Sequence, residues 1–322
     1  MERRLPSPAS LRSAPSPAKR ERGGPVAKRW GGEGSRTTLP VLTLLFALLL
    51  LWYLGAVGLN RSLVLDRYER DGHRDWTLAE LVTDTWSMTR PILPAPHQVF
   101  AELDRSVLEV APTSPRSLLY HGWVTLGTAL LGFAIGGVLG IGLAVGIVHV
   151  KVLERSLMPW LITSQTIPIL AIAPMIVGVL GRAGLPGIIP KAIISAYLCF
   201  FPVTIGMSKG LVSPEPLQLD LVRTYSANRW QIFWKLRWPA SLAFLFTSLK
   251  VAIALSIVGA IVGELPTGAQ AGLGARILSG SYYGQTAQIW ASLIIASLLA
   301  GGAVASVGWV ERLTRRHMGS TP

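Results

Sequence analysis

Cysteine is almost absent from this 322-residue sequence, which contains one, Cys199. A single thiol cannot form a disulfide within the chain, so no disulfide framework holds the fold together. Cys199 lies inside a long apolar run, where a cysteine behaves as a small buried hydrophobic residue. It therefore carries no information about the redox compartment of the protein.

Charged residues are also few. They make up 15% of the chain, whereas hydrophobic residues make up 50%, a balance that excludes an ordinary soluble domain. The apolar residues gather in runs of roughly 20, the length that a helix needs to cross a bilayer. We therefore predict an all-α fold, a polytopic membrane helix bundle with six transmembrane helices. The predicted spans cover residues 39–59, 122–148, 158–180, 187–207, 242–265 and 289–310.

Lysine is missing between residues 60 and 121, a stretch with seven arginines and nine acidic residues. The positive charge behind the net charge of +13 lies instead in residues 1–38, 149–157, 208–241 and 311–322. An excess of Lys and Arg marks cytoplasmic loops, so both termini and the 208–241 loop are predicted to be cytoplasmic. The basic character thus reflects topology and does not indicate nucleic-acid binding.

The first 38 residues combine Ser-Pro repeats with basic clusters and have too little apolar surface to fold, which predicts a disordered cytoplasmic tail. A cleaved signal peptide is the alternative, but without a clear small-x-small cleavage site the apolar run fits an anchor better. The predicted order is this tail, a first transmembrane helix at 39–59, an extracytoplasmic segment at 60–121, a five-helix core at 122–310 and a tail at 311–322.

Signatures of catalysis are missing as well. The chain has no Gly-Lys-Ser/Thr phosphate loop, so we expect no nucleotide or other cofactor to be bound by this chain. The histidines lie in loops, at span ends or in the tail, which argues against a membrane-embedded hydrolase or a metal centre. They are His73, His97, His121, His149 and His317.

Small residues recur at four-residue spacing in two of the predicted spans. Gly132, Gly136 and Gly140 are joined by Gly142 and Gly146 in the second span, and Gly259 and Gly263 repeat the pattern in the fifth. Such faces let helices approach closely in lipid, so helix packing is preferred here over a role in lining a solute path. Prolines within or beside the spans, such as Pro159, Pro168 and Pro202, are expected to permit kinks.

A basic, aromatic loop, DLVRTYSANRWQIFWKLRWP at 220–239, separates two long apolar segments. Ser226 follows Asp220 by six positions, and Leu236, Arg237, Trp238 and Pro239 close the loop. This spacing resembles the cytoplasmic coupling loop of ABC-importer permeases, Glu-Ala-Ala, three residues, Gly, nine residues, Ile-x-Leu-Pro. Identities differ, because Asp220 replaces Glu, bulkier residues replace both alanines, Ser226 replaces Gly and Trp238 replaces Leu.

The resemblance extends from residue 91 to 312. Over this range the chain is similar to the nitrate, sulfonate and taurine branch of binding-protein-dependent permeases. Passages in family order include PILPAPHQVFAEL, HGWVTLGTALLGFAIGGVLGIGLAVGI, PWLITSQTIPILAIAPMIVGVLGRAGLP and LKVAIALSIVGAIVGEL. The family implies two permease subunits, here a homodimer, in the cell inner membrane. It also implies two cytoplasmic ATPases that bind ATP-Mg and an extracytoplasmic solute-binding protein. The implied function is import of a small polar or anionic solute, such as nitrate, a sulfonate, taurine or a pyrimidine-type precursor.

The candidate coupling residues follow from this resemblance and from helical spacing. A short helix near 217–229 would place three apolar side chains on one face for an ATPase cleft. The coupling set is Leu217, Asp220, Leu221, Val222, Tyr225, Ser226, Leu236, Trp238 and Pro239. An alternative reading makes the basic aromatic stretch 229–237 a helix on the inner membrane surface.

Candidate pathway residues are the polar groups within the spans. Gln165 and Thr166 precede Pro168, and they suit either a solute path or a helix-to-helix hydrogen bond. Glu264 ends the fifth span, where it would face the mouth of the path or, as preferred, lie in water at the interface. Lys250 is expected to extend its ammonium toward the cytoplasmic interface. A stand-alone six-helix secondary carrier or channel remains the alternative, and dependence on an ATPase separates the two.

Overall fold

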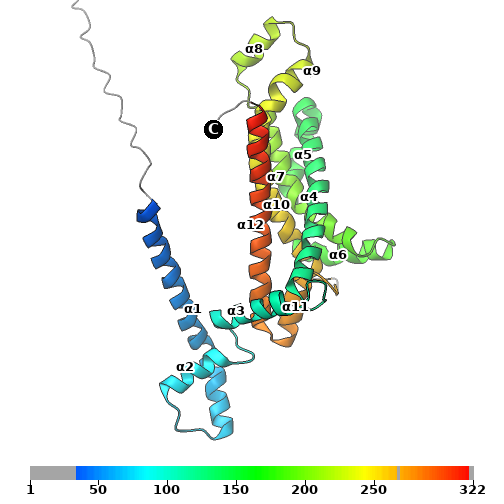
Figure 1. Ribbon diagram of the computed structural model, residues 1–322. Coiled ribbons are helices and arrows are strands. Elements are labelled where there is room, and N and C mark those ends of the chain that lie inside the picture. The colour runs from blue at the N-terminus through cyan, green and yellow to red at the C-terminus, as the bar shows by residue number, and fades with distance from the viewer. Residues whose placement is uncertain (1–33, 267–268, 319–322) are drawn as a thin grey trace, which may run out of the picture. The chain divides into compact units, whose positions relative to one another are not determined.

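A computed structural model describes residues 34–266 and 269–318, with side chains from residue 39 onward. These residues form helices and no strand, which confirms the predicted all-α fold (Figure 1). The predicted disordered tail lies outside the described residues up to residue 33, whereas residues 34–38 belong to the first helix. Contacts divide the chain into two units, before and after the Leu48–Leu49 bond.

The first helix, α1 (Gly34–Asp71), is longer than the predicted 39–59 span. From Leu49 onward it belongs to the second unit, where Val64 and Tyr68 are buried against Leu81 of α2 (Leu78–Ser87) and Met88. Asn60, fully buried, accepts a hydrogen bond from the Ile92 amide at 2.8 Å and donates to the Leu93 carbonyl at 2.9 Å. α1 therefore continues beyond its apolar run, and its C-terminal part packs against α2 and the residue that follows it.

A capping box starts α2. The Glu80 carboxylate accepts from the Thr77 amide at 2.8 Å, and the Glu80 amide donates to the Thr77 hydroxyl. These hydrogen bonds lower the pKa of Glu80 because they stabilise its charged form. The chain then passes through α3 (Pro96–Asp104) and a π-helical turn, η1 (Arg105–Glu109), to the main bundle.

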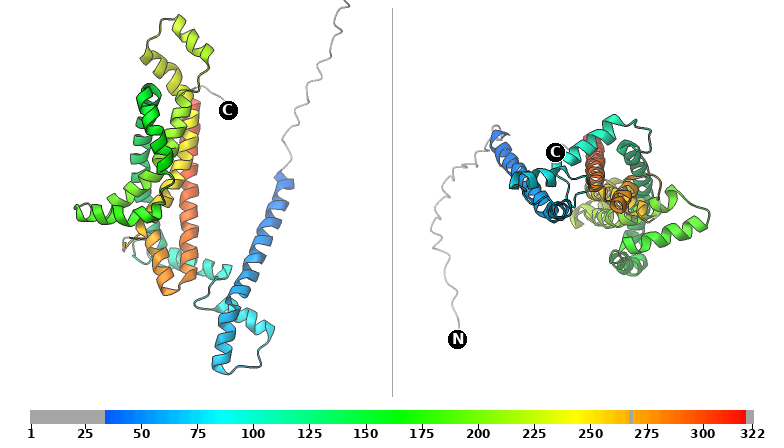
Figure 2. Two further views of the ribbon diagram at one scale, coloured as in Figure 1. Left: turned by 180° about the vertical axis from the view of Figure 1, so that it is seen from behind. Right: turned by 90° about the horizontal axis from the view of Figure 1, so that it is seen from below.

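Three long helices form the centre of the bundle: α4 (Leu118–His149), α7 (Ile188–Leu211) and α10 (Trp238–Glu264). They share a buried cluster that includes Ala144, Cys199, Val203, Met207 and Ala252. Cys199 is thus a buried packing residue, as its sequence context predicts. α12 (Thr286–His317) runs along α10 (Figures 1 and 2). These four helices and α1 are each long and apolar enough to cross a membrane.

Glycines set the closeness of this packing. A Cβ added at Gly132 would lie 2.4 Å from the Ser195 side chain, and one at Gly136 would lie 2.3 Å from the Cys199 sulfur. Gly140 and Gly259 meet α7 in the same way, which confirms the packing role of these positions. Gly142 differs, because a Cβ there would meet no atom within 4 Å. Gly142 therefore lies off the face on which α4 packs against α7 within the chain.

Hydroxyl groups join the three central helices where the glycines bring them together. The Ser195 hydroxyl on α7 donates to the Ser256 carbonyl on α10 at 2.8 Å. Ser256 in turn donates to the Ala129 carbonyl on α4. Both serines are fully buried, so each hydroxyl is satisfied by a neighbouring helix. These two hydrogen bonds fix the spacing of α4, α7 and α10 and their register along the helix axes.

The predicted third span, 158–180, is not one straight helix. It is divided into α5 (Lys151–Ser164) and α6 (Ile169–Arg182), whose axes meet at 101°. Pro168 is the N-cap residue of α6, and a residue that precedes proline disfavours helical geometry. α6 projects sideways from the bundle in both side views (Figures 1 and 2). The total of six predicted spans holds only if this bent pair counts as one.

An ion-pair cluster joins α10 to α12. Glu311 lies 2.5 Å from the Lys250 ammonium and 2.7 Å from the Arg315 guanidinium, and its side chain is largely buried. Lys250 thus extends in the expected direction, toward the predicted cytoplasmic tail at 311–322, where its ammonium pairs with a carboxylate. Pairing the ammonium with a carboxylate on the neighbouring helix costs less free energy than exposing it to hydrocarbon.

Candidate functional site

The segment between α7 and α10 forms a separate lobe at one end of the bundle (Figure 1). It contains α8 (Pro216–Thr224), a single helical turn α9 (Arg229–Ile232) and a π-helical turn η2 (Phe233–Arg237). Pro216 occupies the first turn of α8, where its missing amide costs no hydrogen bond. The Asn228 side chain accepts from the Gln231 amide at 2.9 Å and caps α9. Local sequence signals therefore account for both short helices.

One face of α8 is apolar and exposed. Leu217 is 77% exposed, Leu221 58% and Tyr225, at the C-cap, 81%. Four-residue spacing puts these side chains on one side of the helix, as the sequence predicts. Three neighbouring apolar side chains held in solvent at the tip of a lobe are typical of a docking surface for another protein.

One further residue of the predicted coupling set, Asp220, lies beside this face. Asp220 forms an ion pair with Arg223 at 3.1 Å, and both side chains are about two-thirds exposed. Such a pair stabilises the helix little, which leaves Asp220 available to a partner. Val222 is partly buried on the other side of α8.

Ser226 has a φ of +55°, and it is the non-glycine residue with positive φ within the described ranges 34–266 and 269–318. The left-handed turn that a glycine would make easily is therefore present, although serine occupies it. A side chain in this region of backbone space costs about 1 kcal/mol or more. Serine in place of the family glycine thus keeps the left-handed turn and adds strain to the backbone at this position.

Leu236, Trp238 and Pro239 lie apart from the α8 face. Leu236 belongs to η2, and Trp238 and Pro239 form the first turn of α10, where Trp238 packs against the core of the bundle. The segment from Arg229 to Glu264 is continuous as a span, so helical structure begins ten residues before Pro239. The coupling set thus forms two groups, an exposed face on α8 and a second group around the start of α10, where Trp238 is partly buried against the core.

An aromatic cluster anchors the lobe to the bundle. Phe233 is 6% exposed and meets the His149 ring at the end of α4, with ring centroids 5.3 Å apart. Trp234 and Trp238 contact the same phenyl ring. Trp230 and Trp234 remain exposed and suit the inner membrane surface. Phe233 points inward instead, so the surface-helix reading applies to only part of the stretch.

The candidate pathway residues do not meet. Gln165 and Thr166 are exposed at the break between α5 and α6, where the Thr166 hydroxyl donates to the Thr163 carbonyl at 2.8 Å. Glu264 is fully buried at the far end of α10, so the preferred expectation of contact with water is wrong. Its carboxylate accepts hydrogen bonds from Thr125 on α4 and from the Gly274 amide.

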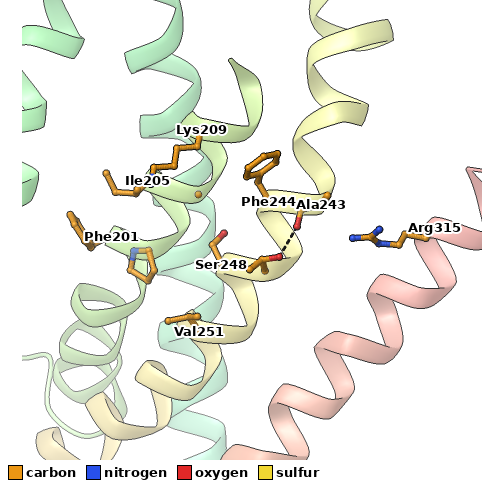
Figure 3. Close-up of a pocket in the computed structure, with 11 residues that line it drawn as sticks. Phe201, Ile205, Lys209, Ala243, Phe244, Ser248, Val251 and Arg315 are labelled. Atoms are coloured by element: carbon orange, nitrogen blue, oxygen red, sulfur yellow. Dashed lines mark hydrogen bonds between the residues drawn. The ribbon is translucent and has the colours of Figure 1, made fainter. Parts of the chain in front are cut away.

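An open pocket of about 520 Å³, called a cavity here for short, lies among α7, α10 and α12 (Figure 3). Its lining is mostly apolar, with Lys209 and Arg315 as charged members. The Arg315 side chain points from α12 toward α10 (Figure 3). Gln165, Thr166 and Glu264 do not line this cavity. Within the described residues no group of His, Cys, Asp and Glu side chains has the geometry of a metal site.

Residues 136–319, more than half of the chain, match the family described as "Binding-protein-dependent transport system inner membrane component". The chain belongs to this family of permeases. It is therefore a multi-pass protein of the inner membrane and a transport subunit rather than an enzyme. ATP is hydrolysed by a separate ATPase subunit.

Relatives of the permease carry different substrates in their names. The formylaminopyrimidine transport permease of Halalkalibacterium halodurans is 32% identical over 69% of this chain and 84% of its own length. The riboflavin transport permease of Chloroflexus aurantiacus is 30% identical over 70% and 80%. A putative aliphatic sulfonates transport permease of Bacillus subtilis is 26% identical over 69% and 76%. Each of these matches thus covers about 70% of the permease and at least three quarters of the relative.

Sequence reasoning missed the residues around Glu264. His121, Thr125, Gly272 and Gly274 lie beside it, although more than 130 positions separate the first two from the carboxylate. The sequence signal for this site is the pair Gly272 and Gly274, because a glycine permits close approach of the backbone to another group. Nothing in the local sequence distinguishes Thr125 from the neighbouring Thr128.

We expect Ser226→Gly to stabilise the α8 lobe of the permease by about 0.5–1 kcal/mol, because glycine removes the cost of a left-handed serine. Hydrogen exchange of the amides in residues 216–230 should slow by roughly threefold. Ala227→Gly is the matched control, since Ala227 has no positive φ and gains only disorder in the unfolded chain. Faster exchange in Ser226→Gly than in the parent would contradict the interpretation.

Proposed function

We propose that this ABC-importer permease translocates a small polar or anionic solute that an extracytoplasmic binding protein delivers. We propose further that α8 is the helix through which a cytoplasmic ATPase drives it. The exposed apolar face of Leu217, Leu221 and Tyr225 carries this proposal. Such a face is costly in water and becomes favourable when a cleft on a partner covers it.

The connection between α8 and the membrane supports transmission of force. The lobe is anchored by Phe233 at the end of α4, and its root at Trp238 is packed into the core. A displacement of α8 therefore shifts the start of α10 rather than being absorbed by a loose linker. ATP-Mg would be bound on the partner subunit, because this sequence has no phosphate loop. The work of this chain is mechanical.

The proposed orientation in the membrane rests on the distribution of Lys and Arg along the sequence. The lobe and both ends of the chain carry an excess of Lys and Arg, which supports the proposal that they lie on the cytoplasmic side. Residues 60–121, without lysine, would then lie outside, together with α11 (Leu273–Tyr283) at the opposite end of the bundle from α8 (Figure 1). In this orientation α8 faces the ATPase and α11 faces the binding protein.

A second copy of the permease completes the proposed pathway. Gln165 and Thr166 are exposed on the single chain within a region apolar enough to enter the membrane. Polar side chains at membrane depth favour the interior of a bundle over lipid, so a homodimer in which the partner covers them is the favoured assembly. The named substrates of the relatives, an aminopyrimidine, riboflavin and sulfonates, support a small polar solute.

The test is uptake into proteoliposomes that contain the permease and the ATPase that copurifies with it. We expect solute uptake that requires both ATP and the binding protein. A stand-alone carrier predicts uptake by the permease alone, driven by an ion gradient and indifferent to ATP. Uptake by the chain without its ATPase would therefore reject the proposal in favour of the carrier.

A further inference from the structure

Three consecutive backbone amides at the start of α11 bind to three side chains from other helices. The Gly272 amide donates to His121 Nδ1 at 2.9 Å, and the Leu273 amide donates to Thr125 Oγ1 at 2.8 Å. The Gly274 amide donates to Glu264 Oε2 at 2.8 Å. The first amides of a helix have no partner within it, so these side chains act as a cap supplied from α4 and α10.

Glu264 is the centre of this cap. The Thr125 hydroxyl donates to both of its carboxylate oxygens, at 2.9 and 3.0 Å, and no part of the residue is exposed. A carboxylate at a helix N-terminus is favoured by the helix dipole, which offsets part of the cost of burial. Thr125 therefore serves twice, as the acceptor for α11 and as the donor to α10.

His121 is held in one tautomer. Its Nδ1 accepts from a backbone amide, so its proton is on Nε2, which donates to the Pro115 carbonyl at 2.8 Å. The ring is 2% exposed and joins α11 to the segment that leads into α4. His121, Thr125 and Glu264 together are called the α11 latch below.

Glycines make this close approach possible. Gly272 has a φ of +122°, and a Cβ there would lie 2.2 Å from the carboxyl carbon of Glu264. A Cβ at Gly274 would lie 2.4 Å from the Ile261 carbonyl. The backbone of α11 thus touches the carboxylate directly, with no room for a side chain between them.

On its other side α11 is joined to α12. Gly284, in the left-handed conformation, and Gln285 connect the two helices, and the Gln288 side chain donates to the Arg276 carbonyl at 3.0 Å. α11 and α12 therefore form a hairpin of their own. The latch supplies the polar attachments of this hairpin to α4 and to the end of α10.

We propose that the α11 latch is a positioning device that holds α11 in place and that is loosened or tightened by movement of α10 during transport. α10 is one 27-residue helix, about 40 Å long, with the root of the α8 lobe at its start and Glu264 at its end. A rigid helix transmits displacement over this length. The link to ATP rests on the proposed role of α8, whereas the positioning role rests on the contacts alone.

The positioning role is tested on the purified chain in nanodiscs by hydrogen exchange. Thr125→Val removes the hydroxyl and keeps the shape, so exchange of the amides in residues 272–283 should accelerate at least tenfold while that of α7 stays unchanged. Thr125→Ser should restore slow exchange. Thr128→Val is the matched control, because the Thr128 hydroxyl donates only within α4, to the Val124 carbonyl. Equal exchange in Thr125→Val and Thr128→Val would overturn the proposal.

Glu264→Gln is the second variant if Thr125→Val does not fold. Its carboxamide keeps an acceptor but places an NH₂ group where both oxygens now accept, so α11 exchange should again accelerate at least threefold. Unchanged exchange in α11 with a folded bundle would reject the latch.

The link to transport is tested with the assembled importer. Thr125→Val is expected to lower the stimulation of ATP hydrolysis by the loaded binding protein at least fivefold, with basal hydrolysis unchanged. Thr125→Ser should recover the stimulation. A purely structural role predicts parallel losses of basal and stimulated hydrolysis, and that result would overturn the link to α10. If α8 does not couple to an ATPase, the parent complex itself shows no stimulation of ATP hydrolysis by the loaded binding protein, whereas the exchange result stands.

Discussion

Gly136→Ala is expected to separate α4 from α7 and to destabilise the bundle by about 2–3 kcal/mol, the upper range for overpacking a tight interface. The added Cβ would lie 2.3 Å from the Cys199 sulfur and 2.7 Å from the Ala196 carbonyl, and the carbonyl cannot move without a shift of α7. The measurement is the thermal unfolding midpoint of the detergent-solubilised chain, together with the yield of monodisperse protein.

Gly142→Ala is the control on the same helix. A Cβ at Gly142 meets nothing within 4 Å, so this change should leave the unfolding midpoint unchanged or raise it slightly through better helix propensity. Adding Cys199→Ala to Gly136→Ala should recover part of the loss, because the sulfur contact disappears and the carbonyl contact remains. Equal midpoints for Gly136→Ala and Gly142→Ala would show that the interface is looser than the contacts imply.

Leu221→Asp is expected to reduce ATP-driven uptake at least tenfold. The side chain lies in the middle of the exposed α8 face, and a carboxylate there would be buried without a partner when an apolar cleft closes over it. Because Leu221 is exposed on the free chain, the unfolding midpoint and the amount of permease in the membrane should stay unchanged. Uptake and copurification of the ATPase should fall together.

Leu78→Asp provides the matched control for this substitution. Leu78 is also strongly exposed, but it begins α2, where an acidic residue suits the helix dipole. Uptake by this variant should equal that of the parent. Wild-type uptake by Leu221→Asp would remove the α8 face from the coupling mechanism.

Much of the candidate coupling site was predictable from spacing alone. The four-residue interval of Leu217, Leu221 and Tyr225 predicts one face, and all three side chains are exposed on it. Serine tolerates a left-handed turn poorly, which made the turn at 226 less certain from the sequence than the rest of the loop, yet Ser226 has positive φ. Such features are local, since they depend on residues within one or two turns of each other. The division of the set into an exposed face on α8 and a second group around the partly buried Trp238 is not local, because the packing of α10 decides it.

The sequence by itself determined the membrane-spanning helical class, the family and the position of the α8 lobe. Long apolar runs have one stable arrangement in a bilayer, and motif spacing survives changes of residue identity. Tertiary structure alone decided the pairing of Lys250 with Glu311 and the burial of Glu264 among Thr125, Gly272 and Gly274. A charge near a helix end can be satisfied by water or by a distant side chain, and only the packing of helices far apart in sequence selects between them.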